Sequence, residues 1–194
     1  MSVLVVGIGG ASCSGKSTLC NNLSQLLLAP IIHQDRFYKS DSLVPIHAEN
    51  GLSNWDSPQA IDCKAFLECL RAAADIESSI VGPNRPQISA LECPDGLKLI
   101  IAKIHEITTA RSIKIVLVDG FLIYHTLPLV EAFGMKIFMT TSFDTLKARR
   151  EERCRKSAYV TSDGFWADPP TYFQDVVWPM YITYNHLVYF ACTV

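Results

Sequence analysis

The chain has 194 residues, 49% of them hydrophobic and 19% charged, and 17 basic against 19 acidic side chains give a formal net charge of −2. This composition indicates one packed domain over residues 1–194 and excludes a disordered or collagen-like chain, while the balanced charge gives no reason to expect nucleic acid as a partner. Seven cysteines without Cys-x-x-Cys spacing are typical of a reducing compartment, so we expect a cytoplasmic or nuclear protein.

The first third of the chain is predicted to alternate strand and helix. Val3–Ile8 is a continuous apolar run typical of a buried parallel strand, and it is too short for a signal peptide or a membrane span. A turn of small residues, 9–15, follows it, and leucines then recur at helical spacing over 16–28. Pro30–His33 is a second, short strand candidate.

The middle of the chain is rich in turn residues. Residues 39–55 are predicted as a loop, and Ser57-Pro58 is a favourable helix start for 57–74. Residues 76–96 carry several Pro and Gly and are expected to be a surface excursion. The apolar stretch 97–107 fits helix or strand, and we favour helix.

The last third returns to alternating strands and helices. Strands are predicted over 113–118, which ends in Asp119-Gly120, and over 135–139. The remaining expected segments are a helix over 142–155, a loop over 157–170, a helix over 172–186 interrupted near Pro179 and a last strand over 187–190. The alternation predicts an α/β fold, a mostly parallel sheet flanked by helices.

A phosphate-binding motif joins the first strand to the first helix. Gly10 to Ser17 fits Gly-x4-Gly-Lys-Ser/Thr, whose backbone amides hold phosphate oxygens while the lysine neutralises them and the hydroxyl binds Mg²⁺. Its buried-strand and helix context favours a P-loop over an incidental Gly/Ser turn. The chain lacks the Asn-Lys-x-Asp motif of GTPases and the Ser-Gly-Gly-Gln motif of transporter ATPases, so a small-molecule kinase is favoured. The predicted nucleotide-binding residues are Gly10, Ala11, Ser12, Cys13, Ser14, Gly15, Lys16, Ser17 and Thr18.

Acidic and basic side chains complete this hypothesis. Asp35 and Asp119 follow strand candidates, whose carboxyl ends gather ligands in a parallel sheet; the alternative is that each only caps a turn. Arg149 and Arg153 lie one helical turn apart and could stabilise a transferring phosphate, or simply form a solvated helix end. Trp55 precedes Asp56, so an aromatic ring and a carboxylate could bind a base and a sugar, although a tryptophan more often anchors a loop.

Together these blocks resemble the nicotinamide riboside kinases, within the uridine-kinase-like group of P-loop kinases. The resemblance rests on several matching stretches, namely the P-loop, Gln34 to Lys39, Trp55-Asp56, Asp119 to Leu122, Arg149-Arg150 with Arg153, Asp168 to Phe173 and Val177 to Tyr181. It implies a phosphotransferase with an alcohol acceptor, which uses ATP and Mg²⁺ to phosphorylate a small-molecule substrate in NAD salvage. The expected substrates are nicotinamide riboside and nicotinic acid riboside, phosphorylated at the ribosyl 5′-hydroxyl.

Residue roles follow from the same resemblance. It implies Asp35 as proton acceptor, with Lys16 and Asp119 also catalytic, and Ser17 with Asp35 as the Mg²⁺ ligands. Nucleotide contacts would add Arg149 and Arg153. The implied substrate contacts are Asp35, Arg36, Phe37, Tyr38, Trp55, Asp56, Arg150 and, across a gap in the match, Tyr159.

The chain also departs from the family's pattern. Asp119 stands where the family usually has Glu, Trp55 where it usually has Tyr, and the surface insertion (about 76–111) and the lid (about 149–170) are longer than expected. The chain ends about where the family continues, so we expect a truncated product with an incomplete adenine pocket. The remaining alternatives are a uridine/cytidine kinase and a catalytically impaired nucleotide-binding protein.

Overall fold

Four parallel strands form the central sheet, in the spatial order β2-β3-β1-β4. The computed structural model describes residues 2–75 and 94–193. Asp119 pairs with Ile8 on one side and with His33 on the other. The ends of three strands therefore meet where the P-loop begins. The strands are β1 (Ser2–Gly10), β2 (Ile31–His33), β3 (Ile113–Gly120) and β4 (Met135–Met139).

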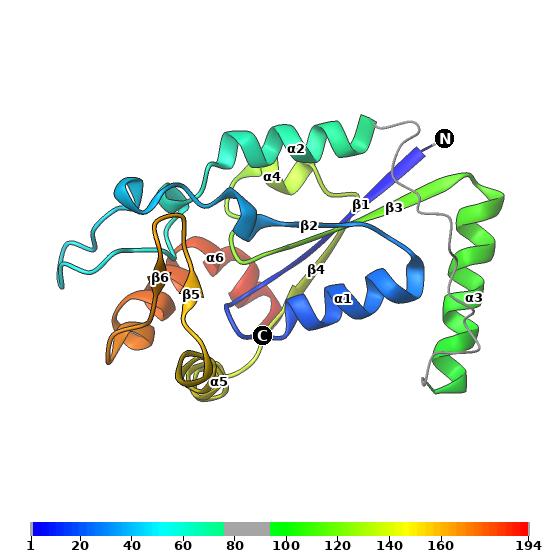
Figure 1. Ribbon diagram of the computed structural model, residues 1–194. Coiled ribbons are helices and arrows are strands. Elements are labelled where there is room, and N and C mark those ends of the chain that lie inside the picture. The colour runs from blue at the N-terminus through cyan, green and yellow to red at the C-terminus, as the bar shows by residue number, and fades with distance from the viewer. Residues whose placement is uncertain (1, 76–93, 194) are drawn as a thin grey trace.

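Helices cover both faces of this sheet (Figure 1). On one face lies α1 (Lys16–Leu27), whose Cys20 packs with Val6, Ile8 and Leu117 from β1 and β3. On the other face α2 (Cys63–Asp75) and α4 (Leu127–Glu131) contribute to a second cluster. That cluster contains Val5, Phe66, Leu70, Val118, Leu129 and Phe133. The apolar β-branched strands are thus buried on both sides, as their sequence predicts.

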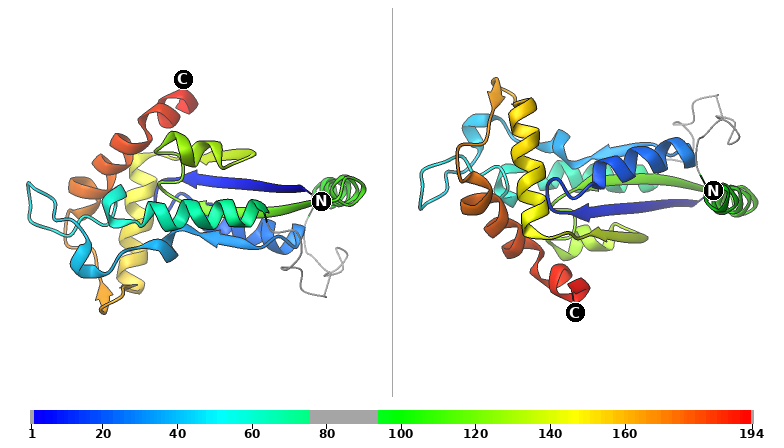
Figure 2. Two further views of the ribbon diagram at one scale, coloured as in Figure 1. Left: turned by 90° about the horizontal axis from the view of Figure 1, so that it is seen from above. Right: turned by 90° about the horizontal axis from the view of Figure 1, so that it is seen from below.

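A further helix, α5 (Phe143–Lys156), lies across the carboxyl ends of the strands (Figure 2). Ser142 caps it by accepting a hydrogen bond from the Thr145 amide. The chain then forms a hairpin of β5 (Tyr159–Val160) and β6 (Phe165–Trp166), a π-helical turn over Phe173–Val177 and the helix α6 (Trp178–Thr193). This arrangement brings α5 and the hairpin to the sheet edge where the P-loop lies.

Several predicted elements are confirmed, including the α/β sheet, α1 and the four strands of the sheet. The prediction of helix for residues 97–107 is also correct, since α3 spans Asp95–Ala110. The expected excursion over 76–96 falls largely on residues outside the described part of the chain.

Three predictions are wrong. The helix expected from residue 57 begins at Cys63, because Ile61 is extended and ends a separate 3₁₀ turn over Pro58–Ala60. The expected loop 157–170 contains the β5–β6 hairpin. Residues 187–190 continue α6 instead of forming a strand. By contrast, the irregularity expected near Pro179 is present: a π-helical turn over Phe173–Val177 leads directly into α6, whose second residue is Pro179.

Candidate active site

The loop between β1 and α1 has the backbone conformation that its glycines permit. Gly10 has φ +143°, and a Cβ there would lie 2.4 Å from the carbonyl oxygen of Met139. Gly15 has φ +102° and directly precedes α1. The backbone therefore turns tightly around the open end of the helix, whose free amides favour an anion.

Lys16 is the buried cation of this loop. Its Nζ donates a hydrogen bond to the carbonyl oxygen of Ala11 at 3.1 Å, and the residue is only 8% exposed. Burial lowers the pKa of Lys16, and the charges of Asp119 and Asp35 act in the opposite direction. An anionic ligand beside the ammonium group would stabilise its charged form and so raise the pKa of Lys16 again.

Asp119 is the buried carboxylate at the end of β3. Its Oδ2 lies 3.2 Å from Nδ1 of His33, the residue opposite it in the β2–β3 ladder. Its Oδ1 is buried and has no hydrogen-bond partner among the described residues. One oxygen is therefore held in place, and the other is left to interact with a ligand, an ion or water.

Asp35 follows β2 by two residues and opens into the cleft. The Asp35 side chain is exposed towards the cleft, and protein atoms surround its other sides. This burial raises the pKa of Asp35, although the charge of Lys16 acts in the opposite direction. The charge of Asp119 raises it further. A carboxylate whose pKa is raised accepts a proton more readily, as a general base must.

The loop and both acids line one cleft of about 1150 Å³. Five of its lining side chains are cationic and three are anionic, so the excess of positive charge favours a polyphosphate. The charged lining residues are Lys16, Lys39, Arg149, Arg150, Arg153, Asp35, Asp56 and Asp119.

Two arginines of α5 face the P-loop side of the cleft. Nη1 of Arg149 donates a hydrogen bond to the carbonyl oxygen of Cys13 at 3.4 Å. The guanidinium of Arg153 lies 4.5 Å from the centre of the Tyr159 ring, within cation–π distance. Both side chains are exposed, which leaves their remaining donors available to a phosphate.

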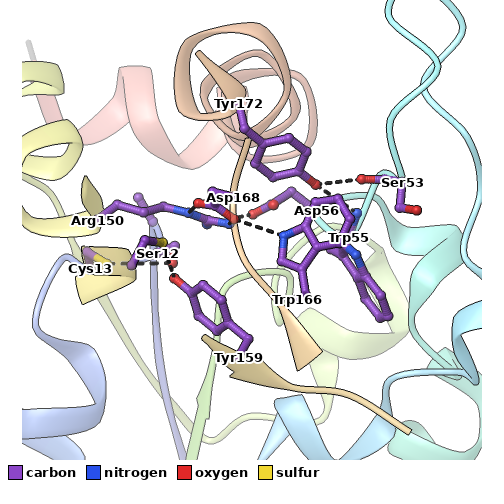
Figure 3. A network of polar contacts seen from close by, with 12 residues as sticks. Ser12, Cys13, Ser53, Trp55, Asp56, Arg150, Tyr159, Trp166, Asp168 and Tyr172 are labelled. Atoms are coloured by element: carbon purple, nitrogen blue, oxygen red, sulfur yellow. Dashed lines mark hydrogen bonds and ion pairs between the residues drawn. The ribbon is translucent and has the colours of Figure 1, made fainter. Parts of the chain in front are cut away.

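Arg150 instead joins the acceptor side of the cleft (Figure 3). It donates two hydrogen bonds to Asp168, from Nε at 2.5 Å and from Nη2 at 3.1 Å, and its Nη1 lies 3.5 Å from Asp56. Burial alone would raise the pKa of Asp168, but the hydrogen bonds and charge of Arg150 outweigh it and lower that pKa. For Asp56, burial dominates and the pKa is raised. Asp168 is thus the main partner of Arg150, and Asp56 is only partly compensated.

Aromatic rings form the walls beside this network. The ring of Trp55 lies 6.0 Å from that of Trp166 and 5.6 Å from that of Tyr38, centre to centre. Nε1 of Trp166 donates to Asp168 at 2.9 Å, and the hydroxyl of Tyr172 accepts a hydrogen bond from the Trp55 backbone amide. The tryptophans therefore have fixed positions, and a flat ring is a suitable ligand for such walls.

The tip of the β5–β6 hairpin is joined to the loop on the opposite side. Thr161 and Ser162 both donate side-chain hydrogen bonds to the carboxylate of Asp41, at 2.7 and 3.0 Å. The Asp41 backbone amide donates in turn to Ser162 Oγ. Because Thr161 and Ser162 also line the cleft, this contact closes the hairpin over it.

The oxygen atoms near the P-loop suit a magnesium ion. The Ser17 hydroxyl and the Asp35 carboxylate are exposed to the cleft, and Asp119 keeps an unpartnered oxygen. Mg²⁺ prefers oxygen ligands and commonly takes one or two from protein beside substrate phosphates. Within residues 2–75 and 94–193, no cluster of three or more His, Cys, Asp or Glu side chains forms a complete metal site.

The structure brings most of the predicted site residues into this cleft. Its lining includes Ser12 to Thr18, Arg149 and Arg153 on the nucleotide side. On the acceptor side it includes Asp35, Tyr38, Trp55, Asp56, Arg150 and Tyr159.

Four of the predicted site residues do not line the cleft. Gly10 and Ala11, at the start of the P-loop, are buried, and Arg36 is exposed to solvent. The Phe37 ring packs 5.2 Å from that of Phe66, in the core.

Sequence reasoning did not single out Trp166 and Asp168 as site residues. An available signal was Asp163-Gly164 between Tyr159-Val160 and Phe165-Trp166, the pattern of a short hairpin. That pattern predicts where a lid folds back, but the partner of Asp168 is 18 residues away on α5. No local pattern predicts that contact.

The amino-acid sequence is similar to those of several known kinases. The chain is 38% identical to a nicotinamide riboside kinase of Schizosaccharomyces pombe, over 95% of the chain and 80% of the relative. It is 34% identical to one of Saccharomyces cerevisiae, over 97% and 80%, and 31% identical to nicotinamide riboside kinase 2 of Homo sapiens, over 94% and 67%.

Family models and solved structures give no further support for an assignment. No family model matches the chain. A solved structure described as a possible uridine kinase from Bacillus stearothermophilus is 15% identical, with a TM-score of 0.43 over 80% of each chain. In the described part of the chain, no helix combines the length and apolarity that crossing a membrane requires.

Proposed function

The chain belongs to the nicotinamide riboside kinase family, and we propose from that premise that its cleft transfers the γ-phosphate of ATP to the 5′-hydroxyl of nicotinamide riboside. The product is nicotinamide mononucleotide, formed in NAD salvage. The observation that supports this proposal is one shared cleft, which Asp35, the P-loop lysine Lys16 and the aromatic ring of Trp55 all line. A kinase needs this juxtaposition of phosphate and alcohol.

The phosphate side of the reaction uses the P-loop. Its amides and the Lys16 ammonium hold the β- and γ-phosphate oxygens, and Arg149 with Arg153 cover the transferring group. A Mg²⁺ ion bound by Ser17 and Asp35 would supply further positive charge at these oxygens. These groups stabilise charge that shifts from the γ-phosphoryl group towards ADP.

The acceptor side positions the alcohol. The ribosyl 5′-oxygen attacks the γ-phosphorus in line, the bond to the β–γ bridging oxygen breaks, and Asp35 accepts the hydroxyl proton. Asp56, held by Arg150, is suited to bind the ribose hydroxyls, and Trp55 with Trp166 is suited to hold the pyridine ring. The pyridine ring carries a positive charge, which favours aromatic walls.

A coupled ADP-release assay tests this function. Purified protein with MgATP is offered nicotinamide riboside, nicotinic acid riboside, uridine and cytidine, and mass spectrometry identifies the phosphorylated product. The proposal predicts the highest kcat/KM with a pyridine riboside and a product phosphorylated at the 5′ position. A large preference for uridine or cytidine, or ATP binding without any phosphorylated riboside, would contradict it.

A further inference from the structure

Gln34 is a fully buried side chain between the ends of β2 and β3. Its Oε1 accepts hydrogen bonds from the backbone amides of Phe121, at 3.1 Å, and Leu122, at 3.0 Å. Because both partners are donors, only the oxygen of the side-chain amide can face them. One side-chain atom thus satisfies two backbone amides that would otherwise be buried without a partner.

These two amides lie just beyond the β2–β3 ladder. The ladder ends at the pair His33 and Asp119, and Gly120 separates that pair from Phe121. Past this point β2 turns into a 3₁₀ helix and offers no further backbone partners to β3. Beyond this pair, the hydrogen bonds between the two strand ends are made by the Gln34 side chain and no longer by the main chain of β2.

Gly120 provides the space for this contact. A Cβ on Gly120 would lie 2.6 Å from Cβ and Oε1 of Gln34 and from Cγ2 of Ile123, closer than real Cβ contacts allow. The glycine therefore matters for its lack of a side chain, and the fit between Gln34 and Gly120 is reciprocal.

The neighbours of Gln34 are the residues that the proposed chemistry uses. His33 contacts the Asp119 carboxylate at 3.2 Å, and Asp35 faces the cleft. Two consecutive side chains thus bind the end of β3, and the third is presented to the substrate. We call these contacts of His33 and Gln34 with the end of β3 the joint. The placement of Asp35 relative to Asp119 depends on this joint.

We propose that Gln34 is a positioning residue, whose amide oxygen fixes the end of β3 against the end of β2 and so sets the placement of Asp119 relative to Asp35. This inference rests on the proposed function for its effect on turnover. It concerns a residue that touches neither substrate, since Gln34 does not line the cleft.

The test compares Gln34→Met, which keeps the length of the side chain and removes the acceptor, with Gln25→Met on the exposed side of α1. At a temperature where circular dichroism shows a folded protein, Gln34→Met should lose kcat by at least about tenfold, because small misplacements of catalytic groups are costly. The KM for ATP should stay unchanged. Gln25→Met should retain both values. A folded Gln34→Met variant with wild-type kcat would overturn the proposal.

A double-mutant cycle separates positioning from general loss of stability. Gly120→Ala should also lower kcat, and the double variant should lose less than the two single losses combined, because both changes disturb the Gln34 contact. Additive losses would contradict the proposal. Should Gln34→Met not fold, Gln34→Asn, which is one methylene too short to reach both amides, takes its place with the same expected kcat loss.

Hydrogen exchange of the Phe121 and Leu122 amides tests the joint without any substrate. In Gln34→Met both amides should exchange at least about tenfold faster than in the wild-type protein, while amides inside β1 stay protected. Unchanged exchange at these two positions would refute the inference. Absence of riboside phosphorylation in the wild-type protein would instead refute the proposed function. Hydrogen exchange would then still test whether Gln34 holds the end of β3.

Discussion

The two ends of the cleft are built in different ways. At the phosphate end, the main chain between two consecutive elements, β1 and α1, forms the site. At the acceptor end, side chains meet across long stretches of sequence: Arg150 contacts Asp56, 94 residues away, and Tyr172 contacts Trp55, 117 residues away. The P-loop itself can therefore form locally, although Arg149 reaches it from α5, 136 residues away. The acceptor end exists only when loop, hairpin and helix are assembled. We expect variants at the two ends to separate effects on transfer from effects on riboside binding.

A substitution of Asp35, which lies where the two ends of the cleft meet, should have the largest effect on phosphate transfer. Asp35→Asn removes the proton acceptor and should reduce phosphate transfer by about three orders of magnitude. ATP should still bind, because the P-loop amides are unchanged. ADP release and calorimetric ATP binding measure the two quantities. Asp95→Asn, an exposed acid of α3, serves as the control, and an active Asp35→Asn enzyme would remove Asp35 as the base.

A change confined to the phosphate end should come second. Lys16→Ala removes the ammonium that neutralises the phosphates, and we expect turnover to fall at least about 100-fold. The KM for the riboside should change little, since the acceptor walls are intact. Steady-state kinetics with both substrates varied measures this, with exposed Lys103→Ala as the control. Normal turnover in Lys16→Ala would show that the phosphate site has been misassigned.

A change confined to the acceptor end should alter binding more than transfer. Asp168→Ala leaves the buried Arg150 without its main partner, and loss of one member of a buried ion pair costs about 3 kcal/mol of unfolding free energy. Asp56 and Trp166 lose their fixed positions, so the riboside KM should rise while the KM for ATP stays the same. Urea unfolding and kinetics report both. Exposed Asp163→Ala on the same hairpin should change neither, and an unaltered riboside KM in Asp168→Ala would break the proposed division between the ends.

The smallest effect is expected at the hairpin tip. Asp41→Ala removes the acceptor of Thr161 and Ser162, so the hairpin should open more often. Limited proteolysis between residues 157 and 170 should be faster than in the wild-type protein, with a modest rise in the riboside KM. Glu49→Ala, in the same loop but exposed, should match the wild type. Equal cleavage rates for Asp41→Ala and the wild type would show that this contact does not hold the hairpin.

The same division explains what the sequence could predict. The P-loop, the buried strands and the acids at the strand ends follow from local patterns: Gly10 to Ser17 for the turn, and an apolar run before Asp119. The parallel sheet then brings the ends of these strands together without further information. These predictions are confirmed for the fold, and the roles of the individual residues remain predictions.

The acceptor side depended on contacts that no local pattern contains. Arg150 belongs to the same basic stretch as Arg149 and Arg153, yet it points to Asp168 and is buried. The apolar residues 187–190 fit a strand or a buried helix equally well, and only the continuous helix from Trp178 decides between them. Long-range packing therefore decides the acceptor side, whereas the missed β5–β6 hairpin had a local signal in Asp163-Gly164.

A crystal structure of the protein with ADP, Mg²⁺ and nicotinamide riboside would test the proposed function most directly. We expect the β-phosphate to lie on the P-loop amides beside Lys16, and the ribosyl 5′-hydroxyl to lie within hydrogen-bond distance of Asp35. The pyridine ring should pack against the aromatic wall that Trp55 and Trp166 form together. A nucleotide bound outside the P-loop, or a riboside whose 5′-hydroxyl faces away from Asp35, would contradict the proposed function.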